Sequence, residues 1–288
     1  MEVMPFESGT NNLTGLMAVP TGDLRVGPAP ARESVAFSLI VPTRNESHNL
    51  DELIQLLTPA IVSQVGDSYE IIVVDDDSPD KTWQVAAEIG ARDPHVKSMR
   101  RVDERGLATA VIRGWQASRG ALLGVIDADL QHPPEVIARL IAAMQGADLA
   151  VASREVEGGG TSDWSVSRLF ISRSLKAFGK MILPGVLGRV TDPMTGFFII
   201  RRTALQDVAM SPCGYKILVE LLVRARIGKI VEVGYVFRSR QRGESKASIQ
   251  VFFDYVQHLL RLRASVREMQ REAAPQELRS KAVTAGRR

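Results

Sequence analysis

Asp127, Asp129 and Gln131 follow a run of apolar and small residues at 121–126, which predicts a buried strand. If the chain stays extended beyond that strand, the three side chains point to the same side. Hard oxygen donors in this arrangement suit Mg²⁺ or Mn²⁺. A nucleotide diphosphate is the natural second anion for such an ion. A strand that ends in an ordinary polar turn would show the same three residues, so the rest of the chain has to decide.

Apolar strands and amphipathic helices alternate around this segment. We expect strands at 35–41, 70–74, 96–101, 121–126 and 148–153, with helices near 50–57, 82–89, 106–117 and 134–144. This alternation predicts an α/β fold with a Rossmann-like, mostly parallel sheet and helices on both faces. Ligands bind beyond the carboxyl ends of such strands. The polar residues after the first, second and fourth strands are therefore expected to meet in one crevice.

The ends of the chain differ from its centre. Residues 1–34 are rich in Gly, Pro, Asn and Thr and predict a flexible leader. A catalytic domain is expected at 35–248, with further helices at 165–180 and 216–224 and strands at 198–201 and 230–237. An amphipathic helix at 249–270 and a basic flexible tail at 271–288 complete the division. A basic amphipathic helix is typical of membrane-surface binding, although packing against the sheet would give the same apolar face.

Composition sets limits on the partners. The 288 residues carry a net charge of +3, but residues 261–288 hold eight Arg and Lys against three Glu. A basic end suits phospholipid or nucleic acid, and nucleic acid is disfavoured because base-stacking aromatics are not interleaved with the charges. Cys213 is the single cysteine, so no disulfide forms within the chain. Without a signal peptide or an apolar spanning segment in this sequence, we expect a cytoplasmic domain that associates peripherally with the membrane.

Several longer motifs, in order over about 36–255, carry a resemblance to a known family. The chain resembles family 2 glycosyltransferases of the GT-A fold, and among them the dolichyl- and polyprenyl-phosphate mannosyltransferases. The motifs are Pro42-Thr43-x-Asn45-Glu46, Val73-Val74-Asp75-Asp76-x-Ser78-Pro79-Asp80-x-Thr82, Gly106-Leu107-x-Thr109-Ala110, Asp127-Ala128-Asp129-Leu130-Gln131-His132-Pro133-Pro134, Ser153-Arg154, Asp192-Pro193-x-x-Gly196-Phe197-Phe198 and Arg240-x-x-Gly243-Glu244-Ser245-Lys246.

The resemblance implies transfer of mannose from GDP-mannose to dolichyl or polyprenyl monophosphate, with inversion and with Mg²⁺ or Mn²⁺ as cofactor. Asp127, Asp129 and Gln131 would hold the metal, and Asp129 and Arg154 would act in catalysis. The acceptor phosphate would meet Arg154, Arg168 and Ser172, of which the last two share a helix face. The nucleotide-sugar site would comprise Pro42, Arg44, Glu46, Val74, Asp75, Asp76, Asp127, Ala128, Asp129, Gln131, Arg240 and Lys246.

Some alternatives stay open at this point. Arg44 stands where the family usually carries an aromatic residue, and because a guanidinium can also stack on a base, the preferred base is not decided. The same chemistry with UDP-glucose or an aminopentose donor is the nearest rival. An inactive nucleotide-sugar-binding protein is the rival from another class, although the complete motifs argue against it. Besides the membrane surface, a small membrane subunit is a candidate partner, and Asp192 and Glu220 are acidic groups without an assigned role.

Overall fold

The computed structural model describes residues 16–30, 33–162, 166–212, 214–239 and 255–268. An eight-stranded sheet has the order β1-β4-β3-β2-β5-β8-β6-β9, and β7 and β10 form a separate pair. The strands are β1 (Leu16–Met17), β2 (Val35–Thr43), β3 (Tyr69–Asp75), β4 (Val96–Arg100), β5 (Gly120–Val125), β6 (Leu149–Ser153), β7 (Gly160–Thr161), β8 (Phe198–Arg201), β9 (Ile230–Gly234) and β10 (Val236–Phe237). The helices are α1 (Ser47–Val65), α2 (Thr82–Arg92), α3 (Leu107–Ala117), α4 (Val136–Ala143), α5 (Val166–Ile182), α6 (Pro184–Leu187) and α7 (Ile217–Arg224), with a 3₁₀ turn at Arg202–Leu205.

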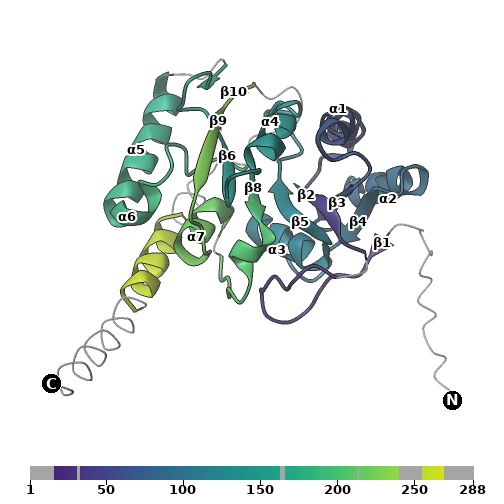
Figure 1. Ribbon diagram of the computed structural model, residues 1–288, viewed down its shortest axis with the longest axis horizontal. Helices are drawn as coiled ribbons and strands as arrows, with labels where there is room; N and C mark the ends of the chain where they lie inside the picture. The colour runs from purple at the N-terminus through teal and green to yellow at the C-terminus, as the bar shows by residue number, and fades with distance from the viewer. Residues whose placement is uncertain (1–15, 31–32, 163–165, 213, 240–254, 269–288) are drawn as a thin grey trace.

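The central strands are apolar on both faces because each face is covered by helices. In β2, Leu39 and Val41 belong to a core shared with α1 and α4. Ile40, between them, belongs to the opposite core with α3 and α7. The same alternation in β3 sends its side chains into both layers. Figure 1 shows α1, α2 and α4 along one side of the sheet, with α3 and α7 on the other. The predicted α/β class with helices on both faces is confirmed.

The chain order reverses at the centre of the sheet. From β2 the chain steps outward to β3 and β4, and then returns to place β5 on the other side of β2. Both β3 and β5 run parallel to β2, whereas β8 runs antiparallel to its two neighbours. The carboxyl ends of β2 and β5 therefore flank a topological switch point, where open α/β sheets bind their ligands.

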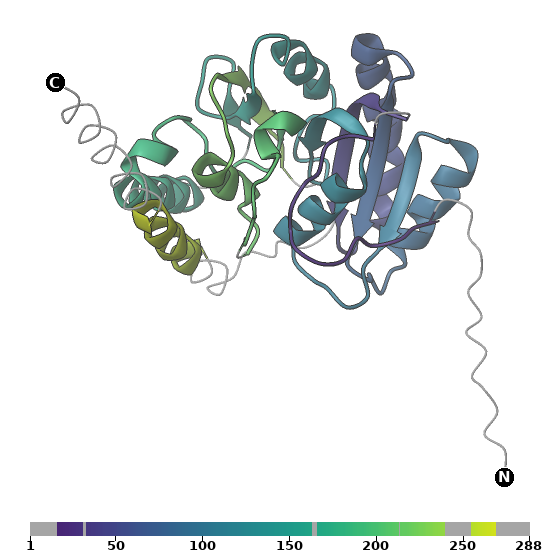
Figure 2. The same ribbon diagram turned by 60° about the horizontal axis from the view of Figure 1, so that its bottom comes forward.

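The prediction of a flexible leader over 1–34 is wrong for residues 16–30. Leu16 and Met17 pair in parallel with β4, Arg25 forms a bridge with Ala209, and Val26 is buried. Gln116 and Arg202 hold this segment further by donating hydrogen bonds to its backbone carbonyls. In Figure 2 the segment, in purple, crosses the side of the molecule that carries α3. Val26 belongs to the core, and Met17, Val19 and Leu24 pack against it, but Gly and Pro interrupt the segment so that its apolar residues show no periodicity in the sequence.

Two further segments depart from the prediction. The strand expected at 230–237 is divided, since β9 pairs with β6 whereas β10 pairs with β7. Residues 255–268 are helical, and Leu259 and Leu262 pack into the core while Arg261, Arg263 and Arg267 are exposed. None of the helices in the described ranges combines the length and apolar character needed to cross a bilayer. The tail at 271–288 lies outside the described residues.

Candidate active site

The ends of three strands bring the predicted nucleotide residues together. Pro42 of β2 lies opposite Val74 of β3, so the next pair in register is Thr43 and Asp75. On the other side of β2, the Ile126 amide donates to the Ile40 carbonyl, which keeps the segment after β5 beside the end of β2. The crevice predicted from the sequence is therefore formed by adjacent strands.

The predicted extended run from Asp127 to Gln131 is wrong. The strand β5 ends at Val125, and Leu130 has a φ of 59°, in the left-handed region. The Gln131 amide donates to Asp129 Oδ1 at 3.1 Å, which closes a tight local turn. A side chain–backbone bond of this kind offers the chain an alternative to the strand ladder. Side-chain alternation along an extended strand therefore does not place these three side chains on one side.

Asp127 lies against a glycine and a buried histidine. A Cβ atom at Gly196 would stand only 2.7 Å from Asp127 Oδ2, so the missing side chain makes room for the carboxylate. His132 Nε2 lies 3.4 Å from the same oxygen. The His132 ring is held by edge contacts with Phe197 and Phe237, at centroid distances of 5.4 and 5.0 Å. The orientation of Asp127 is thus set by neighbours that are themselves packed in the core.

Gln131 connects this turn to the chain after β10. Its side-chain nitrogen donates to the Arg238 carbonyl at 3.0 Å, and the Arg238 amide donates to the Gln131 carbonyl at 2.8 Å. A role for Gln131 as a metal ligand would therefore use its amide oxygen. Arg238 directly precedes the segment with Arg240 and Lys246, and both of those predicted diphosphate ligands lie outside the described residues.

Part of the acidic cluster after β3 supports the loops of the pocket. Asp75 is fully buried, and its carboxylate accepts hydrogen bonds from Thr43 and from the amide and hydroxyl of Ser78. Burial raises the pKa of Asp75, with the Ser78 and Thr43 hydrogen bonds opposing the rise. Asp80 accepts from Ser47 and Thr82 at the starts of α1 and α2. The Asp75 side chain thus shapes the pocket from behind, which differs from the predicted direct contact.

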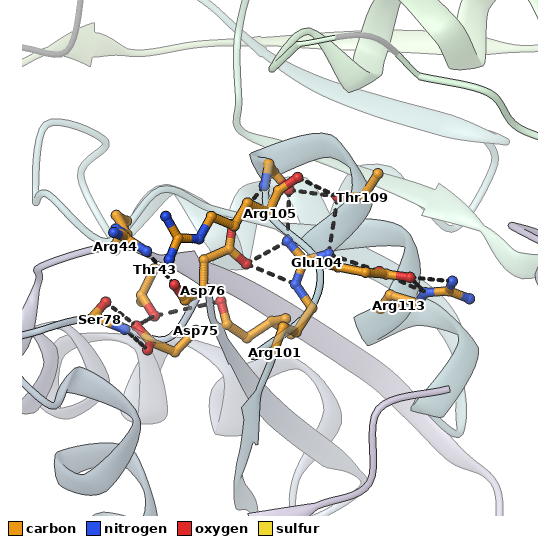
Figure 3. A network of polar contacts seen from close by, with 12 residues as sticks. Thr43, Arg44, Asp75, Asp76, Ser78, Arg101, Glu104, Arg105, Thr109 and Arg113 are labelled. Atoms are coloured by element: carbon orange, nitrogen blue, oxygen red, sulfur yellow. Dashed lines mark hydrogen bonds and ion pairs between the residues drawn. The ribbon is translucent and has the colours of Figure 1, made fainter. Parts of the chain in front are cut away.

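Asp76 is the centre of a polar network (Figure 3). Its Oδ1 accepts two hydrogen bonds from the guanidinium of buried Arg101, and its Oδ2 accepts one from the Gly106 amide at 2.7 Å. Arg44 donates to the Asp76 backbone carbonyl, which places that guanidinium at the same strand end. Glu46, another predicted pocket residue, accepts from Asn49 at the start of α1. The structure therefore brings the Arg44 guanidinium into contact with the Asp76 backbone, and their joint role in nucleotide binding stays a prediction.

Arg154 forms a buried ion pair with Asp192. Arg154 Nε and Nη2 donate to the two Asp192 oxygens at 2.6 and 2.8 Å, and the Arg154 amide also donates to Oδ2. The Arg154 guanidinium also lies over the Phe237 ring at 5.5 Å. The predicted acceptor-phosphate cation is thus held by a carboxylate that had no assigned role.

Lys216 adds a second positive charge beside this pair. Its Nζ donates to the Met194 carbonyl at 2.7 Å and lies 4.3 Å from the centroid of the Tyr215 ring. Burial and the repulsion of Arg154 lower the pKa of Lys216 to about 8, and the attraction of Asp127 and Asp192 only partly opposes them. Among the described residues no carboxylate forms an ion pair with Lys216, and an ammonium group has three N–H donors, so Lys216 keeps donors for an anionic ligand.

The other predicted residues are placed less fully. Arg168 and Ser172 belong to α5, but the positions of their side chains lie outside the described part of the chain. Ala128 sits in the turn between the two aspartates and is buried. Glu220 accepts from Arg224 and from the Ser211 amide and faces His258 at 3.5 Å, so it joins α7 to the helix at 255–268. Glu220 is therefore structural.

The donor set fits a divalent ion that also binds phosphate. Within the described ranges, no group of three or more His, Cys, Asp or Glu is arranged to hold a metal. Asp127 and Asp129 provide carboxylates, which are the hard ligands that Mg²⁺ and Mn²⁺ prefer. Mg²⁺ is commonly held by one or two carboxylates, with substrate phosphates and water completing its coordination. The site therefore fits a metal that arrives with a diphosphate better than a metal held by protein alone.

Sequence reasoning missed Arg101, His132 and Lys216 as parts of the site. His132 stood inside the quoted Gln-His-Pro-Pro motif, and this position was the available signal. Arg101 follows β4 and Lys216 precedes α7, and their partners Asp76 and Met194 are 25 and 22 residues away in the sequence. Their place in the site becomes visible only in three dimensions.

Comparison with known proteins identifies the family. A model of "Glycosyl transferase family 2" matches residues 38–209. A dolichol-phosphate mannosyltransferase of Pyrococcus furiosus is 45% identical over 226 residues, covering 78% of this chain, and the chain spans 63% of that relative's length. The protein of the same name from Saccharomyces cerevisiae is 31% identical, covering 80% of this chain and 87% of its own length. A polyprenol monophosphomannose synthase of Mycolicibacterium smegmatis is 36% identical, with coverage of 77% and 84%.

Solved structures share the fold. Glucosyl-3-phosphoglycerate synthase from Mycobacterium tuberculosis, in complex with Mn²⁺, UDP and glucosyl-3-phosphoglycerate, aligns with a TM-score of 0.59 at 20% identity, covering 81% of this chain and 80% of its own. Mannosyl-3-phosphoglycerate synthase from Rubrobacter xylanophilus aligns with a TM-score of 0.56 at 21% identity, covering 83% and 75%. The predicted GT-A fold is confirmed by these likenesses. With the family model matching more than half of its length, the chain belongs to glycosyl transferase family 2 and is a glycosyltransferase.

Proposed function

We propose that this chain transfers mannose from GDP-mannose to a dolichyl or polyprenyl monophosphate, with inversion, to give polyprenyl-phosphate mannose. The names of the relatives at 31–45% identity support the product and the acceptor class. The structural observation that carries the proposal is the switch-point crevice, with Asp127 and Asp129 after β5 and Asp76 after β3. Nucleotide and metal-binding groups can meet there because β3 and β5 lie on the two sides of β2.

The donor half of the site would use Mg²⁺ or Mn²⁺ held by Asp127, Asp129 and the oxygen of Gln131. When bound, the metal supplies Lewis-acid stabilisation of the charge on the departing nucleoside diphosphate. The Mn²⁺ complex of the M. tuberculosis relative supports this choice of ion. Gly196 leaves room for the Asp127 carboxylate, and His132 fixes its orientation. Arg44 and Asp76 would receive the base, and Arg240 and Lys246 the diphosphate.

The acceptor half needs positive charge more than a strong base. A phosphate monoester has a second pKa of about 6, so it is already an anionic nucleophile near neutral pH. Arg154, Arg168 and Ser172 would orient its oxygens, and Lys216 lies beside Arg154 to share that task. In-line attack on the anomeric carbon would invert its configuration through an oxocarbenium-like state. Asp192 would keep Arg154 in place during the reaction.

Peripheral contact with a membrane is part of the proposal because the acceptor carries a long lipid chain. Arg261, Arg263 and Arg267 are exposed on the helix at 255–268, whose other side packs into the core through Leu259 and Leu262. Each Lys or Arg near an anionic surface contributes about 1 kcal/mol before competing costs. Sedimentation with anionic vesicles at low and high salt measures this contribution. Equal binding by a variant with these three arginines changed to Gln would place the contact elsewhere.

A single assay tests the chemistry. The protein is offered GDP-mannose, UDP-glucose or UDP-GlcNAc with a short polyprenyl phosphate, and lipid-linked sugar is measured with and without excess chelator. We expect mannose transfer that the chelator and Asp129→Ala both abolish. Transfer only from a UDP-sugar would overturn the donor assignment. Tight donor binding without any transfer would indicate a nucleotide-sugar-binding protein instead.

A further inference from the structure

Arg101 uses its whole guanidinium inside the protein. Its side chain is 0% exposed, and Nε and Nη2 both donate to Asp76 Oδ1. Nη2 also donates to the Gly106 carbonyl, while Nη1 donates to Glu104 and Thr109. Every N–H donor of the guanidinium therefore has an acceptor. A buried arginine satisfied in this way holds its partners in one geometry.

The loop around Arg101 is built to keep that geometry. Glu104 is held from its other side by Arg113, through Nε at 3.0 Å and Nη2 at 2.6 Å. Charges thus alternate from Asp76 through Arg101 and Glu104 to Arg113, as Figure 3 shows. Gly106 has a φ of 122°, which residues with a side chain rarely adopt, and its amide donates to Asp76 Oδ2. Arg101 and Gly106 together clamp the Asp76 carboxylate from two sides.

This clamp leaves Asp76 little capacity for a ligand. An ionised carboxylate accepts about four hydrogen bonds, two at each oxygen. Arg101 fills both positions on Oδ1, and Gly106 fills one on Oδ2. The Asp76 side chain is 10% exposed, so a ligand still reaches it from the crevice. One acceptor position on Oδ2 remains for that ligand.

We propose that Asp76 reads the donor nucleobase through one hydrogen bond, from the ring N1–H of guanine, and that Arg101 is the positioning residue that enforces this limit. The proposal rests on the proposed function, which places the base at Asp76. Reading N1–H and the 2-amino group together would need an acceptor on each carboxylate oxygen, and Oδ1 has none left. The ring N1–H is the more acidic of the two donors and so the stronger partner for a carboxylate. The 2-amino group of guanine then contributes nothing at Asp76.

Binding of two nucleotides to the full chain tests the reading. Inosine diphosphate differs from GDP only in lacking the 2-amino group, and we expect its Kd to lie within about twofold of that of GDP. A 1-methyl-GDP, which lacks the N1 hydrogen, should bind at least about tenfold more weakly, the loss expected for one hydrogen bond to a charged group. Weaker binding of inosine diphosphate by about tenfold or more would overturn the proposal.

A variant separates positioning from simple structural support. Arg101→Lys returns at least one acceptor position on Asp76 Oδ1, so it should gain a preference for GDP over inosine diphosphate of about fivefold. Damage to the fold would weaken the binding of both nucleotides equally and leave the ratio of their Kd values unchanged. Arg100→Lys is the matched control, because Arg100 pairs with Asp77 and lies over Trp83 instead. It should keep the parent ratio.

A second variant provides a further measurement in case Arg101→Lys folds poorly. Glu104→Gln keeps an acceptor for Arg101 but removes one charge of the alternating chain, and the GDP to inosine diphosphate ratio should stay at the parent value. An unchanged ratio in a folded Arg101→Lys variant would refute the role given to Arg101. Failure of the parent protein to bind GDP at all, while it binds another nucleoside diphosphate, would instead refute the proposed donor and this reading with it.

Discussion

The ion pair between Arg154 and Asp192 offers a direct test of how burial decides the strength of a charge pair. Its Nε–Oδ2 distance is 2.6 Å, and the two side chains are 13% and 2% exposed. The pair Arg238–Glu135 has the same 2.6 Å distance, but its side chains are 47% and 62% exposed. The exposed pair also makes one hydrogen bond where the buried pair makes three, so it serves as an exposed comparison for the buried pair.

Asp192→Asn should lower the free energy of unfolding by about 3 kcal/mol, near the low end expected when one partner of a buried pair is removed. The remaining amide oxygen still accepts one hydrogen bond, which is why a larger loss is not expected. Glu135→Gln should cost less than about 1 kcal/mol, because exposed pairs are screened by water. Urea unfolding at one pH and salt concentration measures both. Equal losses in the two variants would refute the reasoning.

The same pair predicts the response to acid. Burial alone would raise the pKa of Asp192, but the hydrogen bonds and attraction of Arg154 outweigh it and lower the pKa below the ordinary 3.8. A lowered carboxyl pKa stabilises the fold above the unfolded value, and this contribution is lost as the pH falls through the folded value. Asp192→Asn should therefore flatten the decline in stability below about pH 4. If the free energy of unfolding of Asp192→Asn falls as steeply with decreasing pH as that of the parent protein, this assignment is contradicted.

Three further changes test other parts of the site. Gly196→Ala should displace the Asp127 carboxylate, because the new Cβ would stand 2.7 Å from its Oδ2. We expect the Mn²⁺ concentration for half-maximal activity to rise by about tenfold, while the melting temperature barely changes. Lys216→Met should raise the melting temperature, because a buried charge destabilises the fold. The same variant should lower the activity at saturating donor by about tenfold or more. Full activity would show that Lys216 is not part of the site. Arg168→Ala should weaken use of the lipid phosphate by about ten- to a hundredfold, with GDP-mannose affinity intact, and the reverse pattern in initial rates would oppose its acceptor role.

The sheet and the location of the crevice could be predicted from the sequence because burial on both faces makes strands such as β2 and β3 continuously apolar. The roles of individual carboxylates could not. Asp75 was expected to contact the nucleotide, yet its carboxylate accepts hydrogen bonds from Ser78 in its own loop. Such local bonds leave no periodic signal, since any short polar loop contains the same residue types.

Contacts between distant residues were hidden for a different reason. Arg154 and Asp192 are far apart in the sequence and belong to separate loops, so no spacing relates them. The chain after β5 is not extended because Leu130 adopts a left-handed conformation, which its residue type does not predict. A leucine rarely takes this conformation, and a turn held by Asp129 overrides its preference here. Sequence reasoning found which loops lie at the carboxyl ends of neighbouring strands, whereas the contacts of individual side chains come only from the structure.

The short strand β1 also matters for how the protein behaves in solution. The family match begins at residue 38, but Leu16 and Met17 already pair along the outer side of β4. A fragment that starts at residue 35 would uncover the backbone donors and acceptors of β4. An uncovered sheet edge is a template for pairing with another chain. The segment before the matched domain therefore covers part of the β4 edge, and a boundary drawn from the family match alone would leave that edge open to pairing with another chain.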